Sequence, residues 1–279
     1  MVDDPWIGSV VGGVILLSRL GSGSMGVVYR GRSEALDRHV AVKFIREDNT
    51  AEERGRFLRE GRAAAKVAND HVVRVFATGE VGDNLYIILE LVEGETLAQR
   101  IERDGALDPW MVGHIGVECA LGLAAIHQVG IIHRDIKPDN ILIGLNGRAK
   151  ISDLGLAKVP DEAGLTRTRA VVGTPLYVAP EAVLDPRAIT AAADIYGLGG
   201  TLYHAVAGKP AFDLSEPSAI IRAKLEDALV PLRQVRHGIP TELAQLIERC
   251  LERVPQLRPT ADQLATDLSG IFMRLGRGR

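Results

Sequence analysis

The segment HRDIKPDN, residues 133–140, constrains the fold of this chain more than any other stretch. The apolar triplet ILI follows it directly, and the segment KISD ends at Asp153 shortly afterwards. Two short strands here would bring Asp135, Asn140 and Asp153 together. Carboxylate and amide oxygens suit Mg²⁺, which takes a few carboxylates and completes its coordination with substrate phosphates. Asp135 could instead orient and deprotonate an incoming hydroxyl group.

The two parts of the chain differ in their periodicity. Residues 12–93 contain strand-like segments rich in β-branched residues, interrupted by one helical segment at 50–68. From about residue 95 onward the pattern is mostly helical, with apolar residues at three- and four-residue spacing. Two such sets are Val112, Ile115, Cys119, Leu123 and Ile126, and Leu243, Leu246, Ile247, Cys250, Leu251 and Val254. The sequence therefore predicts an α+β fold, with a small β-rich lobe, a larger helical lobe and a hinge near residues 90–96.

Composition limits the classes of function. A chain of 279 residues suits one bilobal unit or two tightly packed subdomains, and its net charge of −3 gives no overall attraction to nucleic acid or anionic membranes. Cys119 and Cys250 stand apart from any Cys/His cluster, which predicts buried helix thiols in a reducing compartment. The longest apolar run, residues 7–17, is shorter than the roughly 20 residues of a membrane helix. We expect no membrane segment and no signal peptide, although the basic end RLGRGR could lead into a further segment.

A glycine-rich stretch, GSGSMG, lies between two apolar strand-like runs. Gly21, Gly23 and Gly26 form the pattern GxGxxG, in which glycines let backbone amides approach a polyphosphate. A dinucleotide-binding fold would place a helix after the third glycine. A strand follows here instead, which leaves a phosphate-binding hairpin or a plain glycine-rich hairpin.

The strand VAVKF carries a candidate phosphate-binding lysine. Alternation along a strand puts Ala41 and Lys43 on one face, and Val40, Val42 and Phe44 on the other. A lone lysine in a strand is more often an exposed edge charge. Glu60, in the helical segment that follows, is a plausible ionic partner that would hold the ammonium group in place.

Taken in order, these motifs resemble the protein kinase superfamily. The glycine loop, VAVK, Glu60, HRDIKPDN, the DLG step at 153–155 and APE at 179–181 match its pattern over residues 12 to 272. Lys137 and the run GTPLYVAPE, 173–181, are similar to Ser/Thr kinases, and the loop SGSMGVVYRG is similar to eukaryotic-like kinases of bacteria. The resemblance implies the bilobal protein kinase fold, with residues 12–93 as the ATP-binding N-lobe and 94–272 as the C-lobe. The C-lobe would carry the catalytic loop, the activation loop and the peptide docking surface.

The resemblance also implies roles for individual residues. Gly21, Gly23 and Gly26 would cover the ATP phosphates, and Lys43, held by Glu60, would contact them. Val28, Ala41 and Leu142 would sandwich the adenine. Backbone groups of Glu90 and Val92 would form hydrogen bonds with it, and Leu89 would be the gatekeeper residue. Asp135 would orient the substrate hydroxyl, Lys137 would steady the transferring phosphoryl group, and Asn140 with Asp153 would hold Mg²⁺ or Mn²⁺. Asp194, and Glu181 paired with Arg258, are expected to be structural ties.

Leu154 departs from the family pattern, which usually has Phe between Asp and Gly. In the family that the chain resembles, the residue at this position packs against the helix of Glu60 and against His133. The position therefore needs apolar bulk, and the exchange should cost about 1 kcal/mol of packing. Asp153 and Gly155, which carry the chemistry, are intact. The sequence therefore favours a working enzyme.

The stretch between Asp153 and Glu181 suggests regulation. Thr166 and Thr168 resemble autophosphorylation sites of the bacterial kinases. A phosphate there could bind Arg134, with Lys158 and Arg56 completing the pocket. A merely polar loop is the alternative, and Thr174 is expected to be structural, near Lys137 and Asp135.

The resemblance implies a non-specific serine/threonine protein kinase that uses ATP and Mg²⁺, acts on proteins and activates itself by autophosphorylation. The alternative is a kinase-fold scaffold that binds nucleotide without phosphoryl transfer. A small-molecule kinase is disfavoured because GTPLYVAPE resembles a peptide docking surface. We expect a cytoplasmic domain with no nucleic-acid partner. It could form a homodimer for autophosphorylation, and a segment outside this chain could anchor it to a membrane.

Overall fold

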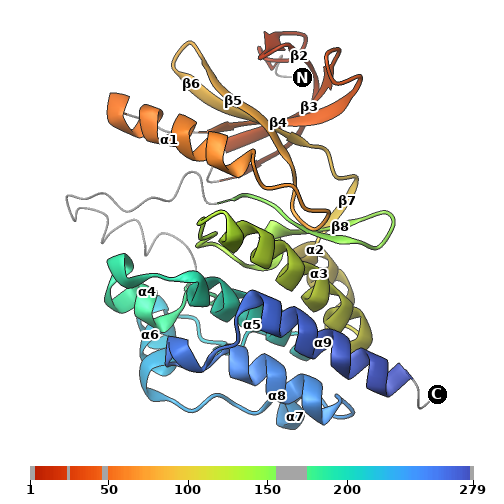
Figure 1. The fold of residues 1–279 in the computed structure, drawn as a ribbon, viewed down its shortest axis with the longest axis vertical. Coiled ribbons are helices and arrows are strands. Elements are labelled where there is room, and N and C mark those ends of the chain that lie inside the picture. The colour runs from red at the N-terminus through yellow and green to blue at the C-terminus, as the bar shows by residue number, and fades with distance from the viewer. Residues whose placement is uncertain (1–3, 24–25, 46–49, 155–174, 277–279) are drawn as a thin grey trace. The chain divides into compact units, whose positions relative to one another are not determined.

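A computed structural model describes residues 4–23, 26–45, 50–154 and 175–276 of the chain. The chain divides into two compact units, Met1–Glu93 and Gly94–Arg279. The boundary lies inside the hinge that the sequence predicts at residues 90–96. The first unit is built mainly from strands and the second mainly from helices, as the α+β prediction requires (Figure 1).

The N-terminal unit is an antiparallel sheet of six described strands in the order β1-β2-β3-β4-β6-β5 (Figure 1). The strands are β1 (Val10–Val11), β2 (Val14–Gly23), β3 (Gly26–Ser33), β4 (Arg38–Ile45), β5 (Val75–Val81) and β6 (Asn84–Glu90). One face of this sheet carries an apolar cluster that includes Val40, Val42 and Phe44, the three residues predicted to share a face of β4. Trp6 lies against Phe44 with its ring centroid at 4.5 Å, so the segment before β1 covers part of this cluster.

Helix α1 (Ala51–Ala64) begins at a capping box. The side chain of Thr50 accepts from the backbone N–H of Glu53, and the Glu53 carboxylate accepts from the backbone N–H of Thr50 at 2.7 Å. The helix packs against β5 at Gly61, where an added Cβ would overlap the Thr78 side chain. It ends at Ala64, four residues before the predicted end.

The C-terminal unit contains a small antiparallel sheet and most of the helices (Figure 1). The sheet has the order β7-β8-β9, with β7 (Gly94–Thr96), β8 (Ile141–Gly144) and β9 (Ala149–Ile151). The α-helices are α2 (Leu97–Asp104), α3 (Pro109–Gln128), α4 (Pro180–Leu184), α5 (Ala191–Ala207), α6 (Pro217–Glu226), α7 (Leu232–Val235), α8 (Thr241–Cys250) and α9 (Ala261–Gly276). Short 3₁₀ turns lie at Pro138–Asn140, Pro186–Ala188 and Pro255–Leu257.

The core of this unit forms where α3, α5, α8 and α9 lie side by side (Figure 1). The five apolar residues that predict α3 are all buried, and both cysteines are buried free thiols on helices, as expected. Among the described helices, α3 is long and apolar enough to cross a membrane by composition alone. Its most apolar 18-residue window is 56% buried in the protein, which fits a core helix packed on α9 and α5.

One residue of the predicted apolar sets is not buried. Helix α8 ends at Cys250, and Leu251 follows it as a buried cap, whereas Val254 lies further on with 49% of its surface exposed. Val254 precedes Pro255 and has extended backbone angles, φ −79° and ψ 113°. The ring of a proline disfavours helical geometry in the preceding residue, so the apolar spacing continues in the sequence after the helix has ended.

Candidate active site

The glycine pattern forms the tip of the β2–β3 hairpin in the N-terminal unit. Gly21 pairs with Val28 and Gly23 pairs with Gly26, so a strand follows the third glycine and the dinucleotide-binding alternative is excluded. Gly26 has φ of 142°, a backbone conformation that side chains rarely adopt. Gly21 and Gly23 are exposed, which leaves their backbone accessible from solvent.

Four predicted ATP-site residues lie on one face of the N-terminal sheet. Val28 is opposite Lys43 in the β3–β4 pair, and Ala41 is opposite Leu89 in the β4–β6 pair. Directly paired residues share a face, and so do residues two apart on a strand. Lys43 is 8% exposed and Ala41 is also 8% exposed, so the lysine is a buried cation and not an edge charge.

Helix α1 lies on the same face of the sheet as Lys43. Thr78, which α1 contacts at Gly61, is paired with Ile87, and Ile87 is paired with Lys43. Glu60 precedes Gly61 and is half-buried. This register puts Glu60 on the side of the sheet where an ion pair with Lys43 can form, and that pair stays a prediction.

The predicted backbone contacts to the adenine, Glu90 and Val92, lie at the end of β6 and just beyond it, and Leu142 lies on β8. The backbone N–H of Glu90 donates to the carbonyl oxygen of Arg74 at 2.8 Å. A base could therefore not use this N–H, and the predicted contact of Glu90 is restricted to its carbonyl oxygen. Val92 and Leu142 are half-buried.

The HRDIKPDN segment brings three of its predicted site residues together. Nζ of Lys137 lies 3.2 Å from Oδ2 of Asp135. Nδ2 of Asn140 donates to the same Oδ2 at 3.0 Å and to the backbone oxygen of Asp135 at 2.7 Å. The Asp135 carboxylate is therefore oriented from two sides, with 14% of its side chain exposed.

The β8–β9 ribbon places Asn140 and Asp153 at the same end. Ile141 pairs with Ile151, and the carbonyl oxygen of Asn140 accepts from the N–H of Ser152 at 2.8 Å. Asp153 follows with φ of 58°, which is uncommon for a residue with a side chain. Because Asn140 donates through Nδ2, its Oδ1 remains the side-chain acceptor. An amide oxygen and a carboxylate are hard ligands that fit Mg²⁺ or Mn²⁺.

Asn140 and Asp153 alone would not complete the coordination of a metal ion. In the described ranges, no group of three or more His, Cys, Asp or Glu side chains is placed to hold a metal ion. Mg²⁺ is commonly held by one or two protein oxygens together with phosphates and waters. The two residues therefore fit a metal that arrives with a polyphosphate better than a permanently bound one.

A buried carboxylate holds the start of the HRDIKPDN segment. Asp194 on α5 accepts from the backbone N–H groups of His133 and Arg134, each at 2.8 Å, and from Nε2 of His127 at 2.8 Å. Its side chain is fully buried, and these three donors compensate its charge. Arg134 has φ of 65°, so the hydrogen bonds stabilise a backbone conformation that is otherwise unfavourable. The predicted structural role of Asp194 is confirmed.

One face of α5 supports both the HRDIKPDN segment and Leu176–Glu181, which we call the docking segment after its predicted role. A Cβ on Gly197 would lie 2.8 Å from the backbone oxygen of Ile136, so glycine permits this close approach. One turn further on, Gly200 leaves room for the Tyr177 ring. The hydroxyl of Tyr177 lies 2.6 Å from Nδ1 of His204, to which it donates when Nδ1 carries no proton.

Two buried cations hold the docking segment. Nζ of Lys224 donates to the backbone oxygens of Leu176 and Val178, each at 2.7 Å. Burial lowers the pKa of Lys224 to about 7, whereas the two carbonyl acceptors favour its charged form. Arg258 makes a bidentate ion pair with Glu181, at 2.6 and 2.8 Å, which confirms the predicted tie.

Lys224 is a residue that the sequence analysis does not predict, although its position in α6 carries a signal. Lys224 lies four residues after Ile220, so the lysine occupies the apolar stripe of α6 where a hydrophobic residue would be expected. Tyr177 and His204 carried no comparable signal, because their contact joins residues that are 27 positions apart.

Several predicted residues fall outside the described ranges. They are Gly155, Lys158, Thr166, Thr168 and Thr174. Leu154 is described and is only 6% exposed, in agreement with the expected need for apolar bulk at this position. Arg134 has a buried Nε without a hydrogen-bond partner among the described residues.

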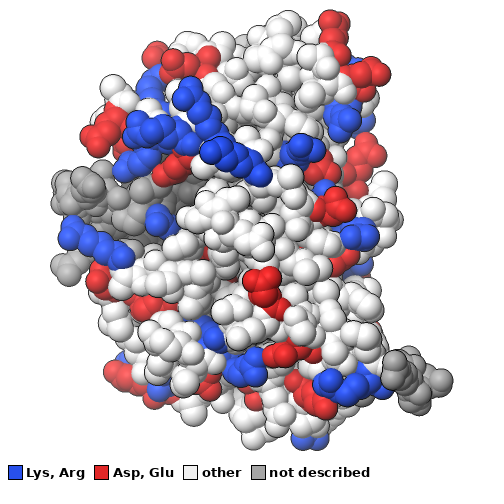
Figure 2. Space-filling model, in the orientation of Figure 1, with Lys and Arg blue, Asp and Glu red and all other residues white. Residues whose placement is uncertain are grey.

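Charged side chains of both signs are interspersed on the visible face, with a gathering of basic side chains over α1 (Figure 2). This helix carries Arg54, Arg56, Arg59 and Arg62. Arg54 lies 3.7 Å from Glu80 and 3.5 Å from Asp83, so part of the positive charge is balanced within the unit. Arg56, the predicted phosphate ligand, is half-buried.

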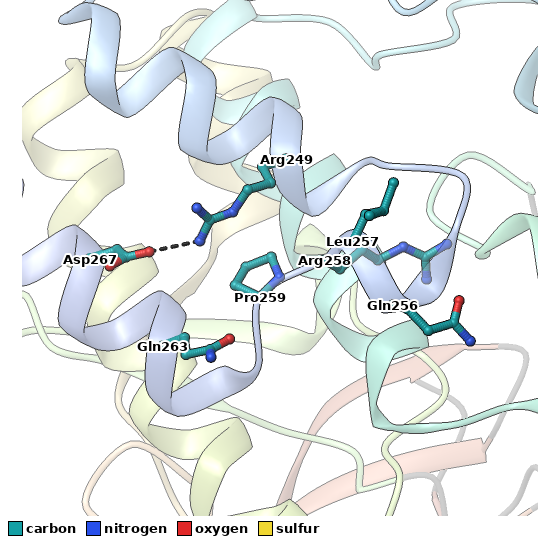
Figure 3. A pocket seen from close by; sticks show the side chains of 7 residues that line it. All are labelled: Arg249, Gln256, Leu257, Arg258, Pro259, Gln263 and Asp267. Atoms are coloured by element: carbon teal, nitrogen blue, oxygen red, sulfur yellow. Dashed lines mark hydrogen bonds and ion pairs between the residues drawn. The ribbon is translucent and has the colours of Figure 1, made fainter.

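An open hollow of about 400 Å³ lies in the C-terminal unit between the end of α8 and the start of α9 (Figure 3). Arg249 and Asp267 form an ion pair across its wall at 2.7 Å (Figure 3). Arg258 also lines it, but its guanidinium is bound to Glu181. No residue of the predicted ATP or catalytic set lines this hollow, so we do not assign the active site to it.

The sheet, the glycine hairpin and the HRDIKPDN loop together define a protein kinase domain. The family model described as protein kinase domain matches residues 15–268, and the chain belongs to this family. It is 38% identical over 268 residues to the serine/threonine-protein kinase PkaB of Streptomyces coelicolor. It is 34% identical over 255 residues to a probable serine/threonine-protein kinase of Clostridium acetobutylicum, and 36% identical over 264 residues to PknK of Mycobacterium tuberculosis.

These alignments cover 92%, 90% and 93% of this chain, but only 62%, 39% and 24% of the three relatives. The chain therefore spans between about a quarter and three fifths of the curated relatives it matches. The crystal structure of Rad53 1-466 in complex with AMP-PNP is similar, with a TM-score of 0.77 and 24% identity. The match covers 91% of this chain and 64% of that one, and it shows that the protein kinase fold is shared.

Proposed function

We propose that this chain is an active serine/threonine protein kinase domain, which transfers the γ-phosphoryl group of ATP to Ser or Thr hydroxyls of proteins. The observation that carries the proposal is the geometry around Asp135. Its carboxylate contacts Lys137 and Asn140, and Asn140 lies at the ribbon end that leads into Asp153. The names of the relatives support the same activity.

The N-terminal unit would bind ATP. Gly21, Gly23 and Gly26 offer backbone N–H groups in a hairpin that can approach the phosphates closely. Lys43, with Glu60 as its partner, would contact the phosphates. The apolar groups proposed for the adenine are Val28, Ala41, Leu89 and Leu142, with backbone contacts from Glu90 and Val92.

The C-terminal unit would carry the transfer step. A bond forms between the substrate hydroxyl oxygen and the γ-phosphorus while the bond to the bridging β–γ oxygen breaks, so that ADP leaves. Asp135 orients the hydroxyl and accepts its proton, and Lys137 steadies the charge on the transferred group. Asn140 and Asp153 would hold Mg²⁺ or Mn²⁺, which neutralises phosphate charge when bound.

Regulation would act through the residues next to Asp135. We place phosphorylation at Thr166 and Thr168, with Arg134 as the arginine that binds the phosphate and Arg56 and Lys158 as its neighbours. The buried Nε of Arg134 supports this, because an arginine without a complete set of acceptors can take up an added anion. Autophosphorylation between two copies would require at least a transient homodimer. Since two buried thiols and ATP chemistry suit a reducing compartment, we place the domain in the cytoplasm, where another segment could anchor it to a membrane.

Intact mass after incubation of dephosphorylated protein with Mg·ATP tests the proposal. The Asp135→Asn variant is the matched control because it keeps the shape and removes the carboxylate. We expect one or more added phosphates on the wild type and none on the variant, mapped to Thr166 or Thr168. Retained ATP binding without added phosphate on the protein or on any added peptide would favour the nucleotide-binding scaffold. Phosphate added only at other positions would support the kinase activity and contradict the assignment of Thr166 and Thr168 as phosphorylation sites.

A further inference from the structure

The docking segment has backbone groups that regular structure does not satisfy. Residue 175, just before the segment, and residues 176–179, at its start, are neither helix nor strand. The carbonyl oxygen of Ala179 accepts from the N–H of Ala182, and the remaining carbonyl oxygens need partners from elsewhere. The ammonium group of Lys224 supplies hydrogen bonds to two of them, on either side of Tyr177.

Lys224 is itself held over an aromatic face. Its Nζ lies 5.0 Å from the centroid of the Tyr196 ring, and Cζ of Arg258 lies 4.9 Å from the same centroid. Arg258 binds the carboxylate of Glu181 at the far end of the docking segment. One buried ring thus orients two cations, one for the carbonyls at the start of the segment and one for its end.

A lysine at this position lowers the stability of the fold relative to an apolar residue of the same size, so stability alone does not explain it. Lys224 is 2% exposed, and removing an ammonium group from water carries a large desolvation penalty. A methionine or leucine would fill a similar volume without that penalty. Three hydrogen-bond donors on one tetrahedral centre can, however, fix two carbonyl directions at once, which an apolar side chain cannot do.

We propose that Lys224 is a positioning residue for the protein substrate: it fixes the backbone of Leu176–Val178, and through it the surface on which a Ser- or Thr-containing peptide docks. This inference rests on the proposed kinase function. Tyr177 is a second anchor of the same segment, through its hydroxyl to His204. Lys224 reaches the substrate only through the segment and takes no part in phosphoryl transfer.

The test separates peptide docking from ATP chemistry. A peptide library with a fixed central Ser or Thr supplies the best substrate of the wild type, which then serves as the probe. The variants are Lys224→Met, Lys224→Arg and Tyr177→Phe, and the control is Arg222→Met, an exposed cation on the same helix. For each protein, kcat and KM for the peptide, KM for ATP and peptide-independent ATP hydrolysis are measured.

We expect Lys224→Met to raise the peptide KM about tenfold, since two hydrogen bonds that hold the segment are lost. ATP hydrolysis and the ATP KM should stay within about twofold of the wild type, and Lys224→Arg should recover part of the loss. Arg222→Met should be unchanged. Should Lys224→Met fail to fold, Lys224→Arg gives the decision, with a smaller rise in the peptide KM and an unchanged ATP KM expected.

An unchanged peptide KM in a folded variant would overturn the inference, as would an equal fall of peptide phosphorylation and ATP hydrolysis. Both results leave the kinase function standing, because the wild type phosphorylates the probe. A wild type that phosphorylates no member of the library rejects the kinase function, and the inference is rejected with it.

Discussion

The carboxylate of Asp194, on α5, lies 2.8 Å from the backbone N–H of His133, 61 residues earlier in the chain. This contact joins the central helix of the C-terminal unit to the loop that carries Asp135. The loop therefore depends on a helix residue that is remote in sequence.

Replacement of Asp194 by Asn tests this dependence. One amide oxygen cannot accept from all three donors, and the amide NH₂ would face a backbone N–H. We expect a loss of about 1–3 kcal/mol in the free energy of unfolding and a lower kcat. Thermal unfolding and kinetics measure both, and Asp262→Asn, an exposed site on α9, is the control. A variant with wild-type stability and kcat would contradict the role of Asp194.

Glycines on α5 should differ in their tolerance of a side chain. Gly197→Ala places a Cβ 2.8 Å from the backbone oxygen of Ile136, which cannot move without moving the loop. We expect about 1–3 kcal/mol of destabilisation. Gly200→Ala meets its nearest atom, Cδ1 of Tyr177, at 3.4 Å and should be nearly neutral. Denaturant unfolding of the two variants side by side measures the difference, and equal stabilities would reject the close approach at Gly197.

The buried ion pair of Arg258 and Glu181 should be far more sensitive than an exposed pair. Arg258→Met leaves the Glu181 carboxylate without its guanidinium, and we expect a loss of about 3–5 kcal/mol. Arg274→Met removes the partner of Glu242 in an exposed pair, and the expected change is below about 1 kcal/mol. Urea unfolding curves compare the two, and similar losses for both would count against the buried network.

Acid should weaken the fold around the docking segment. Burial lowers the pKa of His204 below its ordinary 6.5, while the charges of Asp213 and Asp139 act in the opposite direction. The folded protein therefore binds this proton less readily than the unfolded chain does. The contribution to stability is present above pH 6.5 and is lost as the pH falls through the lowered value.

His204→Gln keeps a hydrogen-bond acceptor for Tyr177 and removes the titration. The free energy of unfolding of this variant should fall less steeply than that of the wild type below pH 6.5. Parallel curves for the two proteins would show that His204 does not cause the dependence.

The two thiols should be inert in the folded protein. Cys119 and Cys250 are fully buried, and burial raises the pKa of both, that of Cys250 to about 12. Since the thiolate is the reactive form, we expect no labelling by iodoacetamide in buffer and two labels per chain in denaturant. Mass spectrometry counts the labels, and rapid labelling of the folded protein would refute the burial.

Much of this protein was readable from local sequence. Alternation places Ala41 and Lys43 on one face of a strand, and three- and four-residue spacing predicts α3. The two short strands after HRDIKPDN bring Asn140 and Asp153 to the same end of a ribbon. These features depend on neighbours a few residues away, where backbone geometry alone fixes which side chains share a face. The same local logic fails at Val254, where Pro255 disfavours the helical geometry that the apolar spacing implies.

Tertiary structure decided what the sequence could not. The apolar stripe of α6 gives no reason for Lys224 to be charged, and only the folded chain brings the carbonyls of Leu176 and Val178 within 2.7 Å of its ammonium group. Likewise, α5 contains several glycines, and only the tertiary structure shows that Gly197 is the one that lies against Ile136. Contacts between residues far apart in sequence depend on the packing of whole helices, and no local period encodes which polar groups that packing will leave in need of a partner.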